Sequence, residues 1–245
     1  MTTAAAIIIG DEILSGKVRD ANAPLLIDLF RDSGVELRRL VCIADGVEVI
    51  SAEVQGCAAS HDVVVTSGGI GPTHDDRTVA GVAHAFSVPV VRDEELAGMI
   101  RGFWGTRVND AALRMADVPE GARLVYGGDG LLPIVAIANV YLLPGIPELF
   151  RAKLPTLRRH ITGTRAALGS VWLRSDESSI AELLARIEAE HGGVKVGSYP
   201  SLHDREFRIW VTLEGADPAE VGRAVTALVD ALEPDEVVRV EPPGP

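Results

Sequence analysis

A buried strand that runs directly into a glycine-rich loop is the feature that most constrains how this chain can fold. Residues 62–66 read Asp-Val-Val-Val-Thr, and residues 67–73 read Ser-Gly-Gly-Ile-Gly-Pro-Thr. A helical pattern begins near Thr78 and continues to about Phe86. Glycines allow positive φ and a close approach of the backbone, so that successive N–H groups can face one anion. The segment therefore predicts an α/β domain that holds a phosphorylated small molecule at the end of a strand.

Apolar runs alternate with amphipathic stretches on both sides of this loop. Ala4 to Ile9 is a continuous apolar run, as expected for a parallel strand covered on both faces. Asn22 is predicted to be the N-cap of a helix, with Pro24 in its first turn and Gly34 behind its end. Further strands are expected at 35–43, 134–137 and 140–143, and further helices at 47–60, 93–104, 110–115 and from Pro147 through Leu154. The β-α-β order predicts an α/β fold with a doubly wound, mostly parallel sheet.

The pattern changes after Thr162-Gly163, which indicates a second domain. Strands are expected at 171–173, 194–199, 207–213 and 237–240, with helices opened by the capping box 179–182 and by Asp217. The order β-α-β-β-α-β is that of a small α+β, ferredoxin-like unit. We therefore predict two domains, 1–165 and 166–245, with a frayed tail at 242–245.

The charge and the cysteines limit the kind of partner. The chain has 23 basic and 35 acidic residues, a formal net charge of -12, and no contiguous basic stripe, so a nucleic-acid surface is not expected. No apolar run approaches the roughly 18 residues of a membrane span, so no membrane partner is expected either. Residues 1–4 lack the basic region of a secretory signal and are expected to begin the mature fold. Cys42 and Cys57 are interpreted as buried free thiols of a cytoplasmic protein.

Two adjacent carboxylates follow the glycine-rich loop. Asp75 and Asp76 would repel an anion unless a divalent cation lay between carboxylate and phosphate. A tight turn with an aspartate cap explains the glycines, but it does not require this pair together with the hydroxyls of Thr73 and Thr78. We therefore expect a phosphate site that includes a metal ion. The loop residues expected to bind phosphate are Ser67, Gly68, Gly69, Gly71 and Thr73.

A series of motifs between residues 4 and 160 resembles a known family. In order, the motifs are 10–16 (Gly-Asp-Glu-Ile-Leu-Ser-Gly) with Asn22, 45–46 (Asp-Gly), 68–78, Asn109 with 118–122, and 142–148. Together they resemble the molybdopterin-binding fold family, which includes MoaB, MogA and the gephyrin-type transferase domains. Within it, the chain looks closest to the CinA-type N-terminal domain and to the molybdopterin-binding-like domain of eukaryotic FAD synthase. The stretch 197–200 (Gly-Ser-Tyr-Pro) also looks like the companion domain of FAD synthase.

The resemblance implies roles for particular residues. Two aspartates of the family are catalytic or metal-associated, and they match Asp45 and Asp76 here. Asn22, Pro144 and Gly145 lie in the matching motifs and are expected to bind the substrate. These residues come from widely separated parts of the sequence, so the fold has to bring them together.

The metal site is expected to be built from carboxylates. Asp45 and Asp76 would hold a divalent cation, which would be Mg²⁺, Mn²⁺ or Co²⁺, and Asp75 would support them. Glu12 follows the first strand, where open α/β sheets place their ligand crevice. For Glu12, a place in the metal shell and a solvated loop charge are both open.

The activity that the resemblance implies is hydrolysis. CinA-type and FAD-synthase-type members are implied to be metal-dependent hydrolases of nucleotide diphosphate bonds, such as those in ADP-ribose, FAD or CoA. The stretch 126–134 departs from the CinA-type pattern, so the substrate stays open. The alternative is a pterin-binding module that binds molybdopterin without hydrolysing it.

The second domain is expected to contribute to assembly. Along 207–213 apolar residues alternate with polar ones, which places Trp210 beside Arg208 on the open face of a sheet. A large aromatic side chain there is better explained by contact with another surface than by contact with water. We therefore expect a homo-oligomer, a dimer with a trimer as the alternative, in which residues 166–241 help to form the dimer and cover the active site.

Overall fold

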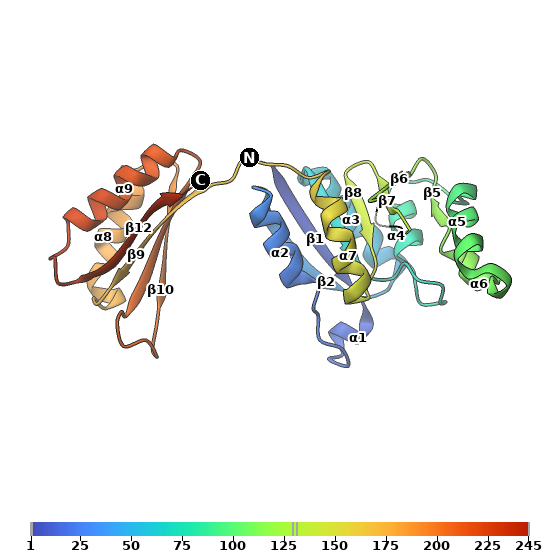
Figure 1. Cartoon of the computed structure of the whole chain (residues 1–245), viewed down its shortest axis with the longest axis horizontal. Coiled ribbons are helices and arrows are strands. Elements are labelled where there is room, and N and C mark those ends of the chain that lie inside the picture. The colour runs from blue at the N-terminus through green and yellow to red at the C-terminus, as the bar shows by residue number, and fades with distance from the viewer. Residues whose placement is uncertain (1, 129, 131, 245) are drawn as a thin grey trace. The chain divides into compact units, whose positions relative to one another are not determined.

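The computed structural model describes residues 2–128, 130 and 132–244 (Figure 1). The chain divides into two compact units, residues 1–163 and residues 164–245, which we call the N-terminal and C-terminal units. Each has its own hydrophobic core.

The N-terminal unit is built on a six-stranded sheet. Its strand order is β2-β1-β3-β8-β7-β6, in which the first four strands are parallel and the last two are antiparallel to their neighbours. The strands are β1 Thr3–Ile9, β2 Glu36–Ile43, β3 Val63–Ser67, β6 Arg123–Val125, β7 Ile134–Ile137 and β8 Val140–Leu143. The mostly parallel sheet predicted from the sequence is therefore confirmed.

Helices cover both faces of this sheet (Figure 1). Alternate residues of β1 face opposite sides, so that Ala4, Ala6 and Ile8 join one core while Ala5, Ile7 and Ile9 join the other. The first core is completed by α2 (Ala23–Asp32) and α7 (Pro147–Arg158), the second by α3 (Val47–Ser60) and α4 (Thr78–Ala85). A sheet covered in this way explains why β1 and β3 read as continuous apolar runs.

The segment between α4 and β6, which we call the excursion, lies outside the six-stranded sheet. It consists of β4 (Val90–Arg92), α5 (Glu94–Trp104), the short helix Gly105–Arg107, α6 (Asp110–Arg114) and β5 (Asp117–Pro119). The two strands pair antiparallel with each other, and Leu96, Ile100 and Val118 lie in a small core of their own. The two helices were predicted from the sequence, whereas this two-stranded sheet was not.

The C-terminal unit has one four-stranded sheet with strand order β10-β11-β9-β12, all antiparallel. Its elements are β9 Ala167–Leu173, α8 Glu177–Glu190, β10 Val194–Pro200, β11 Ile209–Gly215, α9 Pro218–Asp230 and β12 Val237–Gly244. Both helices pack on one face, where Val171, Leu184, Val211 and Leu228 are buried. The order matches the ferredoxin-like arrangement predicted from the sequence.

The opposite face of that sheet carries an aromatic row. Tyr199, Trp210 and Trp172 are cross-strand neighbours, and the two indoles are stacked with ring centroids 6.1 Å apart. The guanidinium of Arg239 lies 3.7 Å above the Trp172 ring. Trp172 is thereby buried, while the buried Nε1 atom of Trp210 has no hydrogen-bond partner among the described residues.

Three local predictions were wrong. Helix α8 begins at Glu177, so Ser179 lies within its first turn and donates to the Asp176 carbonyl instead of opening a capping box. The tail is not frayed, because β12 extends to Gly244. Cys42 is exposed, because it lies on β2 at the edge of the sheet, whereas Cys57 is buried as expected.

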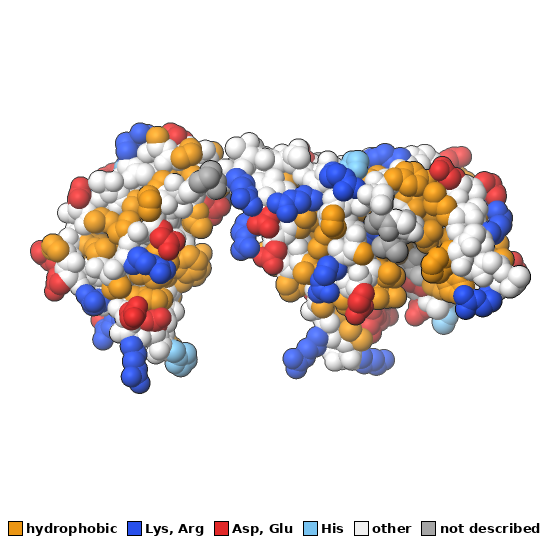
Figure 2. Space-filling model, viewed as in Figure 1, with side chains coloured by type: hydrophobic (Ala, Val, Ile, Leu, Met, Phe, Trp, Pro, Cys, Tyr) orange, Lys and Arg blue, Asp and Glu red, His pale blue; other side chains and the backbone are white. Residues whose placement is uncertain are grey.

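The described helices include none that is long and apolar enough to cross a membrane. On the face drawn in Figure 2, basic and acidic side chains are interspersed in both units rather than gathered into a continuous basic stripe.

Candidate functional site

The carboxyl ends of the four parallel strands meet along one edge of the N-terminal sheet. Ile9 of β1 lies opposite Ile43 of β2, and Ser67 of β3 lies opposite both Ile8 of β1 and Leu143 of β8. Strand order reverses between β1 and β3, and in open α/β sheets ligands bind outside the strand ends at such a switch point. The predicted site residues all lie at, or shortly after, one of these four strand ends.

The backbone of the glycine-rich loop adopts a conformation that side chains do not allow. Gly68 has φ 107°, and a Cβ there would lie 2.2 Å from the Ile9 carbonyl oxygen. Gly69 has φ 64°, and a Cβ there would lie 2.3 Å from Thr78 Oγ1. That hydroxyl donates a 2.7 Å hydrogen bond to the Gly68 carbonyl oxygen, which fixes the loop to the start of α4. Both glycines are therefore required by close contacts as well as by positive φ.

The same conformation leaves consecutive N–H groups free. Within the described part of the chain, no acceptor bonds the backbone N–H groups of Gly69, Ile70 or Gly71. Helix α4 begins at Thr78, so the positive end of its dipole lies beyond the loop. Successive free N–H groups before a helix N-terminus are the usual backbone site for a phosphate.

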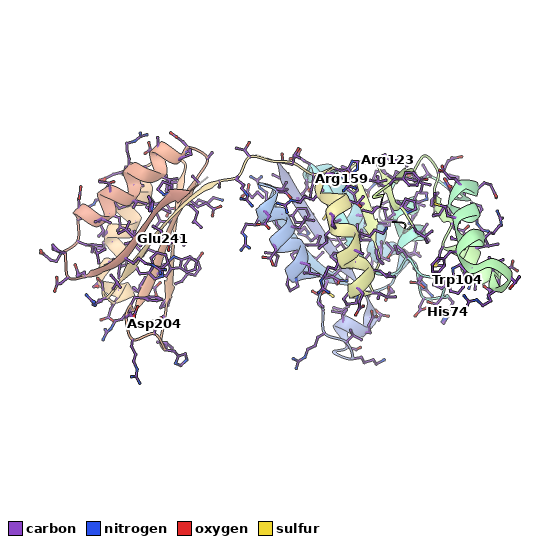
Figure 3. All side chains as sticks on the ribbon, in the orientation of Figure 1. His74, Trp104, Arg123, Arg159, Asp204 and Glu241 are labelled. Carbon is purple, nitrogen blue, oxygen red and sulfur yellow. The ribbon has the colours of Figure 1, made fainter. Side chains whose placement is uncertain are left out.

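Contacts on both sides fix the outer part of the loop. The backbone N–H and the hydroxyl of Thr73 both donate to Asp76 Oδ2, at 2.8 and 2.5 Å. Nε and Nη2 of Arg114, at the end of α6, donate to the Pro72 carbonyl oxygen at 3.2 and 2.7 Å. His74 at the loop surface is 96 % exposed (Figure 3). Sequence reasoning missed Arg114, because no local pattern indicates a contact between residues 42 positions apart.

Asn22, at the start of α2, supports the site from the face of the sheet opposite to α4. It occupies the N-cap position of α2, as predicted from the sequence, but its side chain makes no capping hydrogen bond. The side chain of Asp20 accepts from the N–H groups of Asn22 and Ala23 instead. The Asn22 amide donates to Ser67 Oγ at 2.9 Å and to the Gly145 carbonyl oxygen at 2.8 Å.

The remaining atom of that amide determines what Asn22 can bind. Its Oδ1 is buried without a partner among the described residues, and the side chain is only 4 % exposed. Because a carbonyl oxygen can only accept, the atom facing Gly145 must be nitrogen. In this arrangement Asn22 therefore offers a ligand an acceptor, which suits a hydroxyl, an N–H group, a water or a cation rather than a phosphate oxygen.

The loop after β8 closes the site beside Asn22. The Ser67 hydroxyl donates to the Pro144 carbonyl oxygen at 3.4 Å. A Cβ on Gly145 would lie 3.1 Å from the Gly68 Cα atom. Pro144 and Gly145 thus hold the start of the glycine-rich loop in position.

Carboxylates gather at the ends of β1 and β2. Asp45 Oδ2 accepts from the N–H of Asp11 at 2.8 Å. Burial, followed by the nearby charges of Asp11, Glu12 and Asp75, raises the pKa of Asp45, against the lowering effect of the Asp11 hydrogen bond. Asp45 is therefore within electrostatic range of Glu12 and Asp75, and it contacts Asp11, a carboxylate residue that sequence reasoning did not select.

These residues suit a divalent cation that completes its shell with other ligands. Carboxylate oxygens are preferred by Mg²⁺ and Mn²⁺, and a cation would offset both the burial of the Asp45 carboxylate and the repulsion from its neighbours, which together raise its pKa. No three His, Cys, Asp or Glu side chains of the described chain already form a metal cluster. A cation that takes one or two carboxylates and fills the rest of its shell with water and substrate phosphate fits this donor set.

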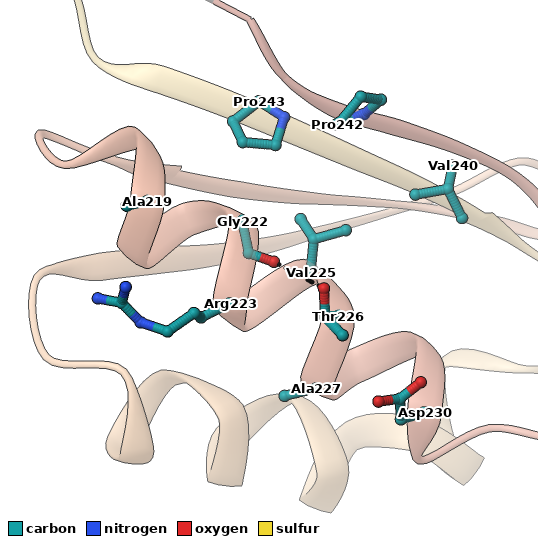
Figure 4. Close-up of a pocket in the computed structure, with 10 residues that line it drawn as sticks. All are labelled: Ala219, Gly222, Arg223, Val225, Thr226, Ala227, Asp230, Val240, Pro242 and Pro243. Atoms are coloured by element: carbon teal, nitrogen blue, oxygen red, sulfur yellow. Dashed lines mark hydrogen bonds between the residues drawn. The ribbon is translucent and has the colours of Figure 1, made fainter.

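A shallow groove in the C-terminal unit is unrelated to these residues. It lies between α9 and β12 and is lined by residues such as Ala219, Val240 and Pro243 (Figure 4). The Thr226 hydroxyl in its lining is already bonded to the Gly222 carbonyl oxygen. None of the predicted site residues lies in this groove.

The chain belongs to the family described as "Probable molybdopterin binding domain", which matches residues 5–162. Residues 166–241 match a second family, "FAD synthase, middle domain". The resemblance inferred from the motifs is therefore confirmed for both units.

Individual proteins agree with this assignment. A "Probable FAD synthase" of Caenorhabditis elegans is 31 % identical over 258 residues, which cover 94 % of this chain and 50 % of that protein. A "CinA-like protein" of Myxococcus xanthus is 36 % identical over 152 residues, 59 % of this chain and 36 % of that protein. This chain thus spans about half, or less, of the length of these relatives.

Among the solved structures that the chain resembles is a protein 30 % identical to it. It is "the protein CinA with unknown function" from Thermoplasma acidophilum, with a TM-score of 0.60. The match covers 65 % of this chain and 97 % of that one.

The loop conformation predicts a specific effect of Gly69→Ala. The added methyl group meets Thr78 Oγ1 and stands at positive φ, so we expect a loss of about 1–3 kcal/mol in unfolding free energy. The displaced N–H groups should also weaken AMP binding by about tenfold, as for the loss of a hydrogen bond to a charged group. Calorimetry and thermal melts measure both. Gly98→Ala in α5, where a Cβ has open space, is the control and should be neutral or stabilising. Unchanged AMP affinity in Gly69→Ala would show that the loop is only a turn.

The pKa of Asp45 predicts that Asp45→Asn stabilises the metal-free protein at neutral pH. A pKa raised above its unfolded value means that the ionised carboxylate lowers stability, and this cost disappears as pH falls through the raised pKa. The gain in melting temperature should therefore shrink in acid. Asp62→Asn is the opposite control, because hydrogen bonds from Thr3 lower the pKa of Asp62 and its replacement should destabilise. A lower melting temperature for Asp45→Asn at neutral pH would contradict this account.

Proposed function

We propose that this chain is a divalent-metal-dependent pyrophosphohydrolase that acts on a nucleotide-type cofactor or nucleotide sugar, of the ADP-ribose, FAD or CoA class. One observation carries the proposal: free N–H groups at Gly69 to Gly71 lie at the same switch point as the carboxylates around Asp45. An anion site beside a group of carboxylates is electrostatically unfavourable by itself. It becomes favourable when a cation lies between the two.

We assign the following roles to the residues of the site. The N–H groups of the loop bind and orient a phosphate group of the substrate. Asp45 and Asp76 hold the cation, and Asp75 or Glu12 supports it or orients the attacking water. When bound, the cation neutralises the diphosphate and activates that water. Asp76 has a second task, because its carboxylate also accepts both hydrogen bonds from Thr73.

The substrate class rests on similarity as well as on the site. Relatives described as "Probable FAD synthase" cover both units of this chain, and a nucleotide cofactor is what that name implies for the relative. The free acceptor of Asn22 adds a preference for a ligand that carries a donor group, such as a sugar hydroxyl. Phosphorylated ligands with a ribose meet both conditions.

A pterin-binding module without hydrolysis is the second candidate. It is favoured by the family description, which names molybdopterin binding for residues 5–162. Incubation with ADP-ribose or FAD and Mg²⁺, Mn²⁺ or Co²⁺ distinguishes the two, when AMP release is measured beside molybdopterin binding. Metal-stimulated AMP release supports the hydrolase, whereas tight molybdopterin binding without release supports the module.

Asp76→Asn separates the two tasks of Asp76. Asparagine keeps an oxygen that can accept from Thr73, but it loses the charge that a divalent cation needs. We therefore predict a folded protein whose metal-stimulated hydrolysis is abolished, as measured by AMP release against metal concentration. Asp75→Asn is the matched comparison and should retain more activity. Unchanged turnover with an unchanged metal requirement in Asp76→Asn would show that this carboxylate only braces the loop.

We further propose that the chain forms a homo-oligomer, preferably a dimer, to which the aromatic face of the C-terminal unit contributes. A protein that ends at Gly163 keeps every site residue and both cores of the N-terminal unit, so it should fold and still bind AMP. It should nevertheless lose its native subunit number or its turnover. Light scattering and AMP release measure the two properties. Native subunit number together with full turnover would show that residues 164–245 have no part in either.

A further inference from the structure

Arg114 is the basic residue that connects the excursion to the glycine-rich loop. It is the last residue of α6, and its Nε and Nη2 atoms share the Pro72 carbonyl oxygen as acceptor. Pro72 follows Gly71, the last of the residues whose N–H groups are free. The guanidinium is therefore anchored next to the predicted anion site by a neutral group.

The charge of Arg114 is not balanced within the described part of the chain. No described carboxylate forms an ion pair with it, although Asp75 and Asp76 lie only a few residues beyond Pro72. Two other arginines of the excursion behave differently, since Arg92 pairs with Asp117 and Arg101 with Glu94.

The hydrogen-bonding capacity of Arg114 is also only partly used. A guanidinium has five N–H donors in a planar fork, and the two contacts to Pro72 leave the others without a described acceptor. Such a fork matches two oxygens of one phosphate group. An exposed, anchored and unpaired guanidinium beside free backbone N–H groups is thus suited to bind an anion.

We propose that Arg114 forms a second anion subsite, which binds the second phosphate group of a diphosphate ligand while the N–H groups of Gly69 to Gly71 bind the first. This inference rests on the proposed function and adds the feature that distinguishes a diphosphate from a monophosphate. The backbone groups can hold a single phosphate equally well in both kinds of ligand. Arg114 acts only on the additional phosphate.

Inorganic pyrophosphate and inorganic phosphate test this subsite in the full chain, by calorimetry with Mg²⁺ present. We expect the wild-type protein to bind pyrophosphate at least about tenfold more tightly than phosphate, as for one added charge-assisted pair. Arg114→Met should remove most of this preference, because it should lower the affinity for pyrophosphate about tenfold more than the affinity for phosphate. If Arg114 only shapes the loop, its replacement should lower the affinities for pyrophosphate and phosphate by the same factor. That result would overturn the proposal.

Two further variants keep the test decisive. Arg114→Lys keeps the charge but not the fork, so it should retain part of the preference even if the methionine variant folds poorly. Arg101→Met removes an arginine of the same excursion that already pairs with Glu94, and it should change neither affinity. A wild-type protein that shows no preference for pyrophosphate refutes the subsite, whatever its hydrolytic activity. A preference that depends on Arg114, in a protein that releases no AMP from any dinucleotide, supports the subsite and refutes the hydrolase.

Discussion

The approach of Gly68 to the end of β1 is the contact on which the candidate site depends. A Cβ at Gly68 would lie 2.2 Å from the Ile9 carbonyl oxygen, so only glycine lets β3 turn this closely beside β1. That turn directs the chain toward Thr78, whose hydroxyl and N–H bond the carbonyl oxygens of Gly68 and Gly69. The N–H groups from Gly69 to Gly71 are left without partners as a consequence. The free N–H groups that we propose as an anion site are thus a result of the fold.

Electrostatics explain why such a site needs additional positive charge. The chain carries a formal net charge of -12, and burial, followed by the charges of the neighbouring carboxylates, raises the pKa of Asp45. A phosphate at the loop adds to this repulsion unless a cation and a guanidinium offset it. In the proposed site, Asp45 would bind the cation, and the guanidinium of Arg114, held against the Pro72 carbonyl oxygen, would bind an anion.

Most of the fold could be predicted from the sequence, because its signals are local. The apolar run of β1, the glycines after β3 and the hairpin at 134–143 each specify their own element through periodicity or turn chemistry. Contacts between distant residues could not be predicted in this way. Asp20 replaces Asn22 as the capping side chain, Arg114 reaches Pro72 from the excursion, and Trp172 stacks on Trp210 across two strands. Each of these depends on tertiary packing that no short window of sequence contains.

For the candidate site too, local motifs could be predicted from the sequence, whereas contacts between distant residues could not. The motifs selected Asp45, Glu12 and Asp75, and the parallel sheet brings these carboxylates to one edge. The motifs did not show that the Asn22 amide donates to both Ser67 and Gly145. Only its acceptor oxygen is therefore left without a partner in the described part of the chain. That distinction needs the direction of each hydrogen bond, which the sequence does not contain.

A crystal structure of the full chain with AMP and Mg²⁺ tests the central claim most directly. We predict phosphate oxygens within about 3 Å of the backbone nitrogens of Gly69, Ile70 and Gly71, which is the usual hydrogen-bond distance. We also predict Mg²⁺ between that phosphate and the carboxylate of Asp45. AMP bound elsewhere, with these N–H groups facing only water, would contradict the account.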